Sequence, residues 1–258
     1  MGSPSRWDRH PLTHTTNYNN EHSHCPRHRR PSQQGGATIR ALLQQGGFTI
    51  RTLSRNPDSL SATRLFEQGV QVLKCGITDQ SSLVAAFQGV DTVSFMTDKK
   101  GPQGTAGEVL QGKTVLRAVH EVGVRRIVFS SVQSAGHTAS IWGVPHFESK
   151  TEVEKFIKES RLQWTILRPS AFMDVIPLSG AGRYMSLGLI GAMLGQKKPQ
   201  FIATEDIGIV AAKAIAVPER FSGRTIDLAG DELSAEDPKT RLSRPLFRMW
   251  GRLLYLIS

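Results

Sequence analysis

The sequence has few of the features that mark membrane, secreted or disulfide-linked proteins. It contains two cysteines, Cys25 and Cys75, in 258 residues. Two cysteines do not make a disulfide framework, so we expect a reducing, intracellular setting. No run of about 18 apolar residues is present, so we expect no membrane span. The first 30 residues are polar and His-rich and lack the apolar core of a secretory signal peptide. We therefore expect a cytoplasmic protein, with the nucleus as the alternative.

Acidic residues are scarce at both ends of the chain, whose overall net charge is +10. Residues 1–36 carry five arginines against two acids, and residues 239–258 carry five basic residues and no acid. The stretch between them is nearly balanced, with 22 Lys or Arg against 20 Asp or Glu. A nucleic-acid protein usually concentrates basic residues on a recognition element with aromatics. We therefore interpret the basic ends as solvated charge and expect no direct nucleic-acid partner.

The order of the apolar segments predicts an α/β fold. From Gly35 onward, short β-rich segments alternate with segments of helical periodicity. Expected strands cover 48–53, 70–73, 90–97, 126–130 and 163–167, and expected helices cover 37–45, 59–68, 81–88, 112–122 and 147–159. This alternation is typical of a doubly wound parallel sheet of the Rossmann-like kind. The segments after Pro169, including 185–194, 200–203, 206–216 and 224–229, are expected to form a small substrate lobe over the carboxyl ends of the strands.

Four segments resemble the NmrA-like family, a group of atypical short-chain dehydrogenases within the NAD(P)-binding Rossmann superfamily. They are QGGATIRALL, LSRNPDS, the helix that contains FESK, and TILRPSAFMD, in the family's order. The family includes oxidoreductases of biosynthetic clusters and regulators such as a redox sensor and a nitrogen-metabolism repressor. The resemblance implies a NAD(P)-binding domain at 34–238. It would follow a disordered or non-native segment at 1–33 and precede a basic amphipathic tail at 239–258.

The start of this domain departs from the family pattern. Members begin with a strand and a Gly-X-X-Gly-X-X-Gly loop, which lets the backbone approach the cofactor pyrophosphate at a helix N-terminus. Gly35 and Gly36 match the end of the pattern, but Arg29 and Ser32 occupy the positions of its first two glycines. The residues before them are polar and include Pro26, which has no amide hydrogen for a sheet ladder. We therefore expect the first strand to be missing.

The resemblance implies NADP(H) as the cofactor. Arg55 follows the second strand of the family's pattern, where members use an arginine to hold the 2′-phosphate of NADP. Thr97 matches a position near the cofactor at the end of a strand. Gly76 stands where members usually carry an Asp on the adenine side, and Asp79 lies three residues later. The plain alternatives are a surface arginine for Arg55 and a strand-terminal threonine for Thr97.

The chemistry is expected on the helix at 147–159. Typical short-chain dehydrogenases carry Tyr and Lys four residues apart on one helix face, where the ammonium lowers the pKa of the tyrosine. Here Lys150 is present and His146 occupies the tyrosine position. The resemblance implies that Lys150 contacts the cofactor and assists proton transfer, while His146 is a candidate proton relay. Ser130 and Ser131 end the strand beside the expected nicotinamide.

Two further patterns add no function to this reading. His22, His24, Cys25 and His28 are close in sequence, but no second pair with zinc-finger spacing follows, so we expect no metal site. In the tail RPLFRMWGRLLYLIS, arginines and apolar residues recur at helical spacing. This pattern is typical of a membrane-surface helix and of a terminal helix docked on its own domain, and we favour the docked helix.

The sequence leaves three functions open. The preferred one is an NADP(H)-dependent oxidoreductase acting on a small organic substrate, with secondary metabolites as a candidate class. The second is a non-catalytic NAD(P) redox sensor that binds a transcription regulator, which the missing tyrosine favours. The third is an inactive, truncated family member, which Arg29 and Ser32 in the glycine loop favour.

Overall fold

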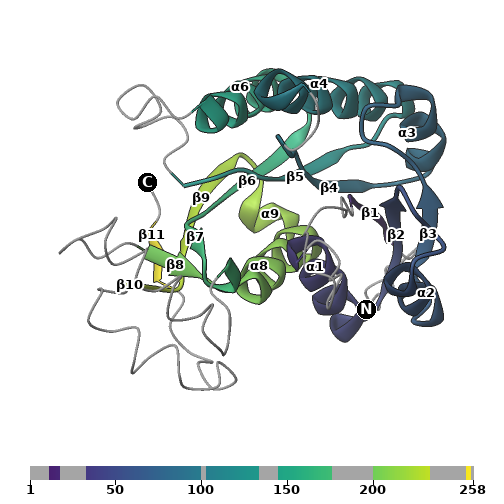
Figure 1. The fold of residues 1–258 in the computed structure, drawn as a ribbon, viewed down its shortest axis with the longest axis horizontal. Coiled ribbons are helices and arrows are strands. Elements are labelled where there is room, and N and C mark those ends of the chain that lie inside the picture. Colours follow the sequence, from purple (N-terminus) through teal and green to yellow (C-terminus); the bar gives the residue numbers. More distant parts are fainter. Residues whose placement is uncertain are drawn as a thin grey trace, which may run out of the picture.

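A computed structural model of the chain describes residues 12–17, 33–99, 103–133, 145–175, 200–232 and 254–256. The described residues form three layers, with a sheet between two layers of helices (Figure 1). The sheet has eight strands in the order β11-β9-β6-β5-β4-β1-β2-β3. Every neighbouring pair is parallel except β11 and β9. The prediction of a doubly wound, Rossmann-like α/β fold is therefore confirmed.

The elements of this sheet and its helices follow the predicted alternation. The strands are β1 (Leu12–Asn17), β2 (Phe48–Ser54), β3 (Gln71–Lys74), β4 (Thr92–Met96), β5 (Arg126–Ser130), β6 (Gln163–Pro169), β9 (Arg224–Ala229) and β11 (Leu254–Leu256). The helices are α1 (Gln33–Gln45), α2 (Leu60–Glu67), α3 (Gln80–Phe87), α4 (Gly104–Val122), α6 (Pro145–Glu159), α8 (Thr204–Ala216) and α9 (Pro218–Phe221). None of these helices combines the length and the apolarity needed to span a bilayer.

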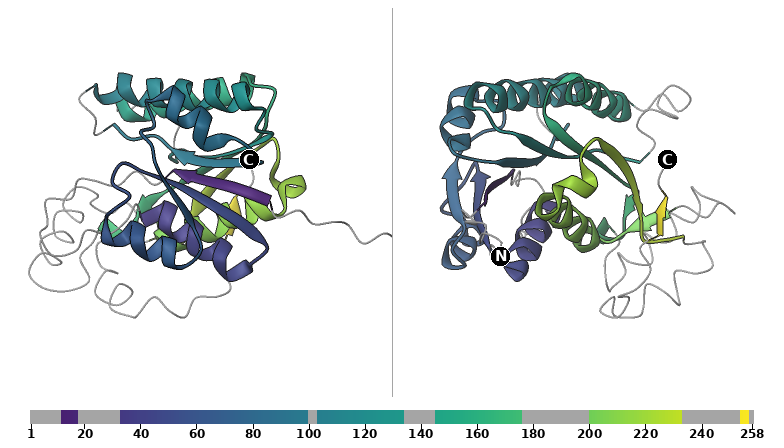
Figure 2. Two further views of the ribbon diagram at one scale, coloured as in Figure 1. Left: turned by 90° about the vertical axis from the view of Figure 1, so that its right-hand side faces the viewer. Right: turned by 180° about the vertical axis from the view of Figure 1, so that it is seen from behind.

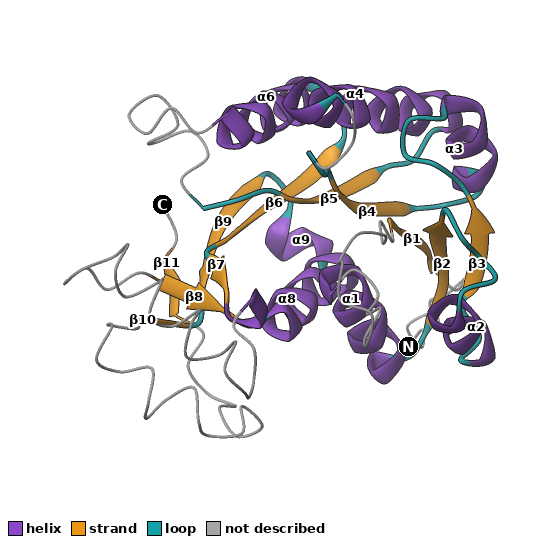
Figure 3. Cartoon of the chain, in the orientation of Figure 1, coloured by secondary structure: helices purple, strands orange, loops and turns teal. Residues whose placement is uncertain are grey.

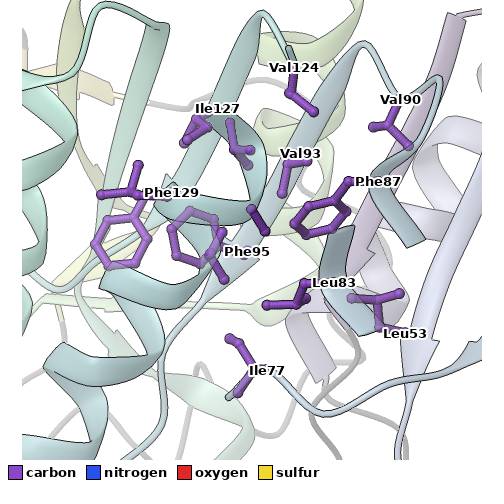
Figure 4. Close-up of a cluster of buried hydrophobic side chains, with 14 of the residues drawn as sticks. Leu53, Ile77, Leu83, Phe87, Val90, Val93, Phe95, Val124, Ile127 and Phe129 are labelled. Carbon is purple, nitrogen blue, oxygen red and sulfur yellow. The ribbon is translucent and has the colours of Figure 1, made fainter. Parts of the chain in front are cut away.

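Helices cover both faces of the sheet, and each face has its own apolar core. The helices α3, α4 and α6 lie on one face, and α1, α2 and α8 lie on the other (Figures 1 and 2). Successive side chains of a strand point to opposite faces. Strand β5 accordingly contributes Ile127 and Phe129 to the core under α3, α4 and α6, and Val128 to the other core. Figure 4 shows part of the first core, where the rings of Phe95 and Phe129 lie 5.0 Å apart.

The expectation that the first strand is missing is wrong. Residues Leu12–Asn17, inside the segment expected to be disordered or non-native, form β1, which pairs in parallel with both β2 and β4. Without this strand, the facing edges of β2 and β4 would leave their backbone groups unpaired in the middle of the sheet. The segment LTHTTN contains three β-branched threonines, a residue type enriched in strands. The central position is therefore filled from farther upstream than the family's spacing suggests.

The expected C-terminal lobe is only partly separate from the main domain. A small sheet of β7 (Ala171–Phe172), β8 (Gln200–Ile202) and β10 (Asp231–Glu232) lies at one end of the molecule (Figure 3). In contrast, β9 joins the main sheet beside β6, and α8 packs beneath the sheet against α1. A side chain at Gly208 of α8 would overlap Ala37, so the two helices approach closely. Residues 185–194 lie outside the described residues.

The docked terminal helix is also a wrong prediction where the structure describes the tail. Leu254–Leu256 form β11, which pairs antiparallel with β9. Short apolar runs do not distinguish a strand from a helix by periodicity alone. Here the open edge of β9 offers unpaired backbone groups, and β11 satisfies them.

Candidate functional site

Lys150 of α6 places its ammonium among oxygens at the carboxyl end of β4. Its Nζ lies 2.8 Å from Glu108 Oε1 and donates to the carbonyl of Thr97 at 3.0 Å. The hydroxyl oxygen of Thr97 is 3.3 Å from the same nitrogen. The ring of Phe129 lies 5.8 Å from Nζ, within the range of a cation–π contact. The structure thus brings together Lys150 and Thr97, two residues that the sequence analysis assigned to the site.

Glu108 completes this cluster from α4. Its side chain is 1% exposed, and it accepts hydrogen bonds from Thr97 Oγ1 at 3.0 Å and from Ser149 Oγ at 2.5 Å. Burial disfavours the charged carboxylate, but the Lys150 ammonium and these hydrogen bonds outweigh it. Together they hold the pKa of Glu108 below its ordinary value. Glu108 is therefore an ionised partner of Lys150 at neutral pH.

Gln111 fixes the loop that follows β4. Its Oε1 accepts from the backbone N–H of Asp98 at 2.9 Å, and its Nε2 donates to the carbonyl of Asp98 at 2.9 Å. Gln111 and Glu108 are three residues apart on α4, so they share a helix face. This face therefore controls both the backbone after β4 and the position of the Lys150 ammonium.

Glu108 and Gln111 were not predicted as site residues, because the helix expected here began at Gly112. In the structure α4 begins at Gly104, eight residues earlier. Its N-terminal half contains Gly104 and Gly107, and glycines of this kind are typical of loops. Gly112 has a packing role, because a Cβ there would lie 2.6 Å from Val153 Cγ2 on α6. This close approach of α4 and α6 brings Glu108 to Lys150. The spacing of Glu108 and Gln111 was the available signal.

The start of α1 lies at the carboxyl end of β5. Gly35 and Gly36 are in the first turn of this helix. Gln34 is 6% exposed, and its Oε1 accepts from Ser130 Oγ at 3.1 Å. Its Nε2 is buried without a hydrogen-bond partner among the described residues, as is Ser170 Oγ directly after β6. Gln34 also lines a cavity of about 30 Å³ between α1, α8 and the strands β4 to β6, large enough for a water molecule.

These two orphaned polar atoms carry information because buried donors without partners are costly, by about 1–3 kcal/mol each. Gln34 is in the first turn of α1, and a helix N-terminus favours anions, while Ser170 directly follows the carboxyl end of β6. An oxygen-rich ligand such as a dinucleotide fits this chemistry. The polar groups at this edge of the sheet are therefore chemically suited to bind a nicotinamide cofactor.

Arg55 lies on the other side of β1 from Lys150. It is exposed directly after β2, and within the described ranges it has no hydrogen bond or ion pair. Asp79, by contrast, is engaged as the N-cap of α3, where it accepts from Ser82 N at 3.2 Å and from Ser81 Oγ at 2.7 Å. Asp79 thus serves its own helix, whereas Arg55 is open to a phosphate.

Ser131 belongs to a second buried cluster, on the inner face of α6. Its hydroxyl donates to Glu154 Oε1 at 2.6 Å. Arg168 of β6 donates to the same carboxylate through Nε at 2.9 Å and Nη2 at 2.6 Å. This pair ties α6 to the sheet.

Several candidate residues lie wholly or partly outside the residues that the structure describes. The backbone of His146 is in the first turn of α6, but its side chain is not described. Arg29, Ser32 and the His22–His28 cluster also lie outside the described residues. Within the part of the chain that the structure describes, no three His, Cys, Asp or Glu side chains are grouped to hold a metal ion.

The sheet order and its two helical layers define the Rossmann-like class of α/β proteins. Within that class, the NmrA-like family matches residues 32–240, so this chain belongs to the NmrA-like family.

Similar proteins include enzymes and a regulator. The NmrA-like family domain-containing oxidoreductase FrzB of a Cladobotryum species is 27% identical over 234 residues, which cover 79% of this chain and 69% of FrzB. The NADPH-dependent quinone oxidoreductase QOR2 of Escherichia coli, solved with NADPH, has a TM-score of 0.66 at 21% identity and covers 86% of this chain and 70% of its own. The negative transcriptional regulator NmrA, solved with NAD, has a TM-score of 0.66 at 15% identity, with coverages of 87% and 68%. At these identities the solved structures show the fold.

Proposed function

We propose that this chain is an NADP(H)-dependent oxidoreductase that acts on a small organic substrate. The observation that carries the proposal is the Lys150 ammonium, held beside Thr97 at the carboxyl end of β4. In open α/β sheets, ligands bind outside the carboxyl ends of the strands where the strand order reverses. Here β1 lies at that point, between β2 and β4. The NADPH bound to QOR2 and the name of FrzB as an oxidoreductase support the same reading.

The residues divide along the expected length of the cofactor. Gly35 and Gly36 open α1, whose N-terminus would hold the pyrophosphate. Arg55 would hold the 2′-phosphate, because a guanidinium pairs well with a phosphate dianion. Lys150 and Thr97 would hold the nicotinamide end, opposite Arg55 across β1. Gln34 and Ser130 would complete the edge near the start of α1.

In the reaction, the bound nicotinamide would supply or accept a hydride. Lys150 would orient the ribose and stabilise negative charge that develops on a substrate oxygen. Its contacts are with Thr97 and with ionised Glu108, so it is suited to act as a fixed cation. His146, on the same helix, remains the candidate for the proton relay.

A second function is a cofactor-binding sensor that controls a transcription regulator. The observation that favours it is His146, which stands four residues before Lys150 where typical short-chain dehydrogenases carry the tyrosine. A sensor needs cofactor binding and no proton donor. The NAD complex of the regulator NmrA supports this alternative.

Cofactor titration tests the proposal. We expect the wild-type chain to bind NADPH more tightly than NADH, measured by fluorescence and by thermal shift. Substitution Arg55→Ala is expected to weaken NADPH binding about tenfold, because charge-assisted hydrogen bonds to the 2′-phosphate are lost. NADH affinity should not change, since NADH has no such phosphate. Arg64→Ala is the matched control, because Arg64 is also an exposed arginine but lies on α2.

The outcomes separate the candidate functions. No response to millimolar NADPH or NADH in the wild-type chain would refute both cofactor-dependent functions. If NADPH binds, its oxidation in the presence of quinones and other carbonyl compounds indicates the oxidoreductase. Binding without turnover across such a panel indicates the sensor.

A further inference from the structure

The Glu108–Lys150 ion pair is a feature that the proposed function does not itself require. Glu108 comes from α4, outside the helix and strands that the sequence analysis assigned to the site. Its Oε1 receives the Lys150 ammonium and the Thr97 hydroxyl, and its Oε2 receives the Ser149 hydroxyl. Contacts on both oxygens leave the carboxylate one orientation. The described polar partners of Glu108 are Lys150, Thr97 and Ser149, which lie together at the carboxyl end of β4.

The location of Lys150 explains why such a partner matters. The side chain is 12% exposed, at the carboxyl end of β4. A lysine is a point charge on a flexible four-carbon stem, so its ammonium stays in one place only when other groups hold it. The Thr97 hydroxyl donates to Glu108, which leaves its oxygen lone pairs to face Lys150. The Thr97 hydroxyl thus bridges the Glu108 carboxylate and the Lys150 ammonium.

The backbone beneath this cluster is fixed by the same helix. Gln111 clamps the backbone of Asp98 through two hydrogen bonds, each 2.9 Å long. The close approach of α4 to α6 at Gly112 and Val153 sets the distance between Glu108 and Lys150. The arrangement is therefore built from packing and polar contacts together.

We propose that Glu108 is the positioning residue of the cofactor site. It acts through Lys150, holding the ammonium as a stationary cation at the end of β4, where the nicotinamide half of the cofactor would lie. This inference rests on the proposed function, because it assumes that Lys150 meets the nicotinamide end. It adds that the affinity for this end depends on a residue of α4 that does not touch the cofactor.

The test measures binding of two probes to the full chain by isothermal titration calorimetry. NADPH reports the whole site, and adenosine 2′,5′-bisphosphate reports the adenine half alone. The variants are Glu108→Gln, Lys150→Met, the double variant and Ser149→Ala. Glu154→Gln is the matched control, since Glu154 is an equally buried acid that pairs with Arg168 instead of Lys150.

Glu108→Gln is expected to lower the affinity for NADPH about tenfold, because the Lys150 ammonium loses a charged partner. Its affinity for adenosine 2′,5′-bisphosphate should stay within about twofold, as expected for independent sites. The tenfold loss should disappear in the Lys150→Met background, since Glu108 acts through the lysine. Ser149→Ala removes one hydrogen bond and keeps both charges, so it should give a smaller loss in the same direction. Glu154→Gln should change neither affinity.

Each other result overturns the inference. Equal weakening of both probes in Glu108→Gln would assign Glu108 to folding alone. Wild-type NADPH affinity in Glu108→Gln and Ser149→Ala would remove the positioning role and leave the proposed function intact. If Glu108→Gln does not fold, the Ser149→Ala result decides. A wild-type chain that binds neither probe refutes the proposed function, and this inference with it.

Discussion

Two buried glutamates, Glu108 on α4 and Glu154 on α6, are alike in exposure and differ in what they hold. Glu154 meets the guanidinium of Arg168 in a two-pronged pair, a rigid geometry that suits a permanent join between a helix and a sheet. Glu108 meets the ammonium of Lys150, which ends a flexible side chain and is held at the carboxyl end of β4. One carboxylate therefore stabilises the fold, and the other fixes the position of an ammonium group.

The largest effect is expected from breaking the pair that secures the fold. Arg168→Met leaves the buried carboxylate of Glu154 with the half-exposed Lys158, 3.5 Å away, as its described charged partner, so the free energy of unfolding should fall by about 3 kcal/mol. Urea denaturation measures this loss. Adding Glu154→Leu should recover most of it, because an apolar pair replaces the ionic one. A loss below about 1 kcal/mol would be typical of an exposed salt bridge and would contradict a fold-stabilising role for this pair.

An intermediate effect is expected from the spacing of α4 and α6. In Gly112→Ala, the new methyl group meets Val153, so stability should fall by about 1–3 kcal/mol. The variant moves Glu108 relative to Lys150, since the two residues lie on opposite sides of this helix contact. NADPH affinity should therefore fall as well. Combining it with Val153→Ala makes room for the methyl group, and a double variant no more stable than Gly112→Ala would contradict this explanation.

The smallest effect is expected on stability in acid. The pKa of Glu108 is lowered on folding, so its ionised form adds stability above its ordinary pKa near 4.5. That contribution is lost as the pH falls through the lower pKa of the folded state. Glu108→Gln should therefore lose less stability than the wild type between neutral pH and about pH 3. Urea midpoints at both pH values give the comparison, and equal losses would mean that Glu108 gains no stability from its ion pair.

Asp91 does not obscure this measurement. Burial opposes its ionisation, but Arg126, Thr92 and Arg125 outweigh burial and lower its pKa. It therefore also contributes to acid sensitivity, but it is present in both proteins and cancels in the difference.

The sequence predicted the site where local pattern and strand position coincide. Lys150 and Thr97 were identified because the family resemblance aligned them with the end of a strand and with a helix, and the structure brings them together. Glu108 and Gln111 were missed because glycines of α4 resemble a loop. Their role depends on packing against α6 at Val153, which is a tertiary fact.

The fold was predicted from Gly35 onward and misread before it. The segment of β1 has threonines and no apolar alternation, so no local signal separated it from its polar surroundings. Its place is determined by β2 and β4, which come later in the chain. The tail was misread in a similar way, because its strand β11 depends on the edge of β9.

The two ends of the main sheet bear on how the protein behaves at high concentration. The described edges are β3, four residues long, and β11, three residues long, whereas β2 and β6 have seven residues each. A long exposed strand is a template on which a second molecule can add its own strand. Short terminal strands offer few such sites, so the longer strands are shielded from edge-to-edge aggregation.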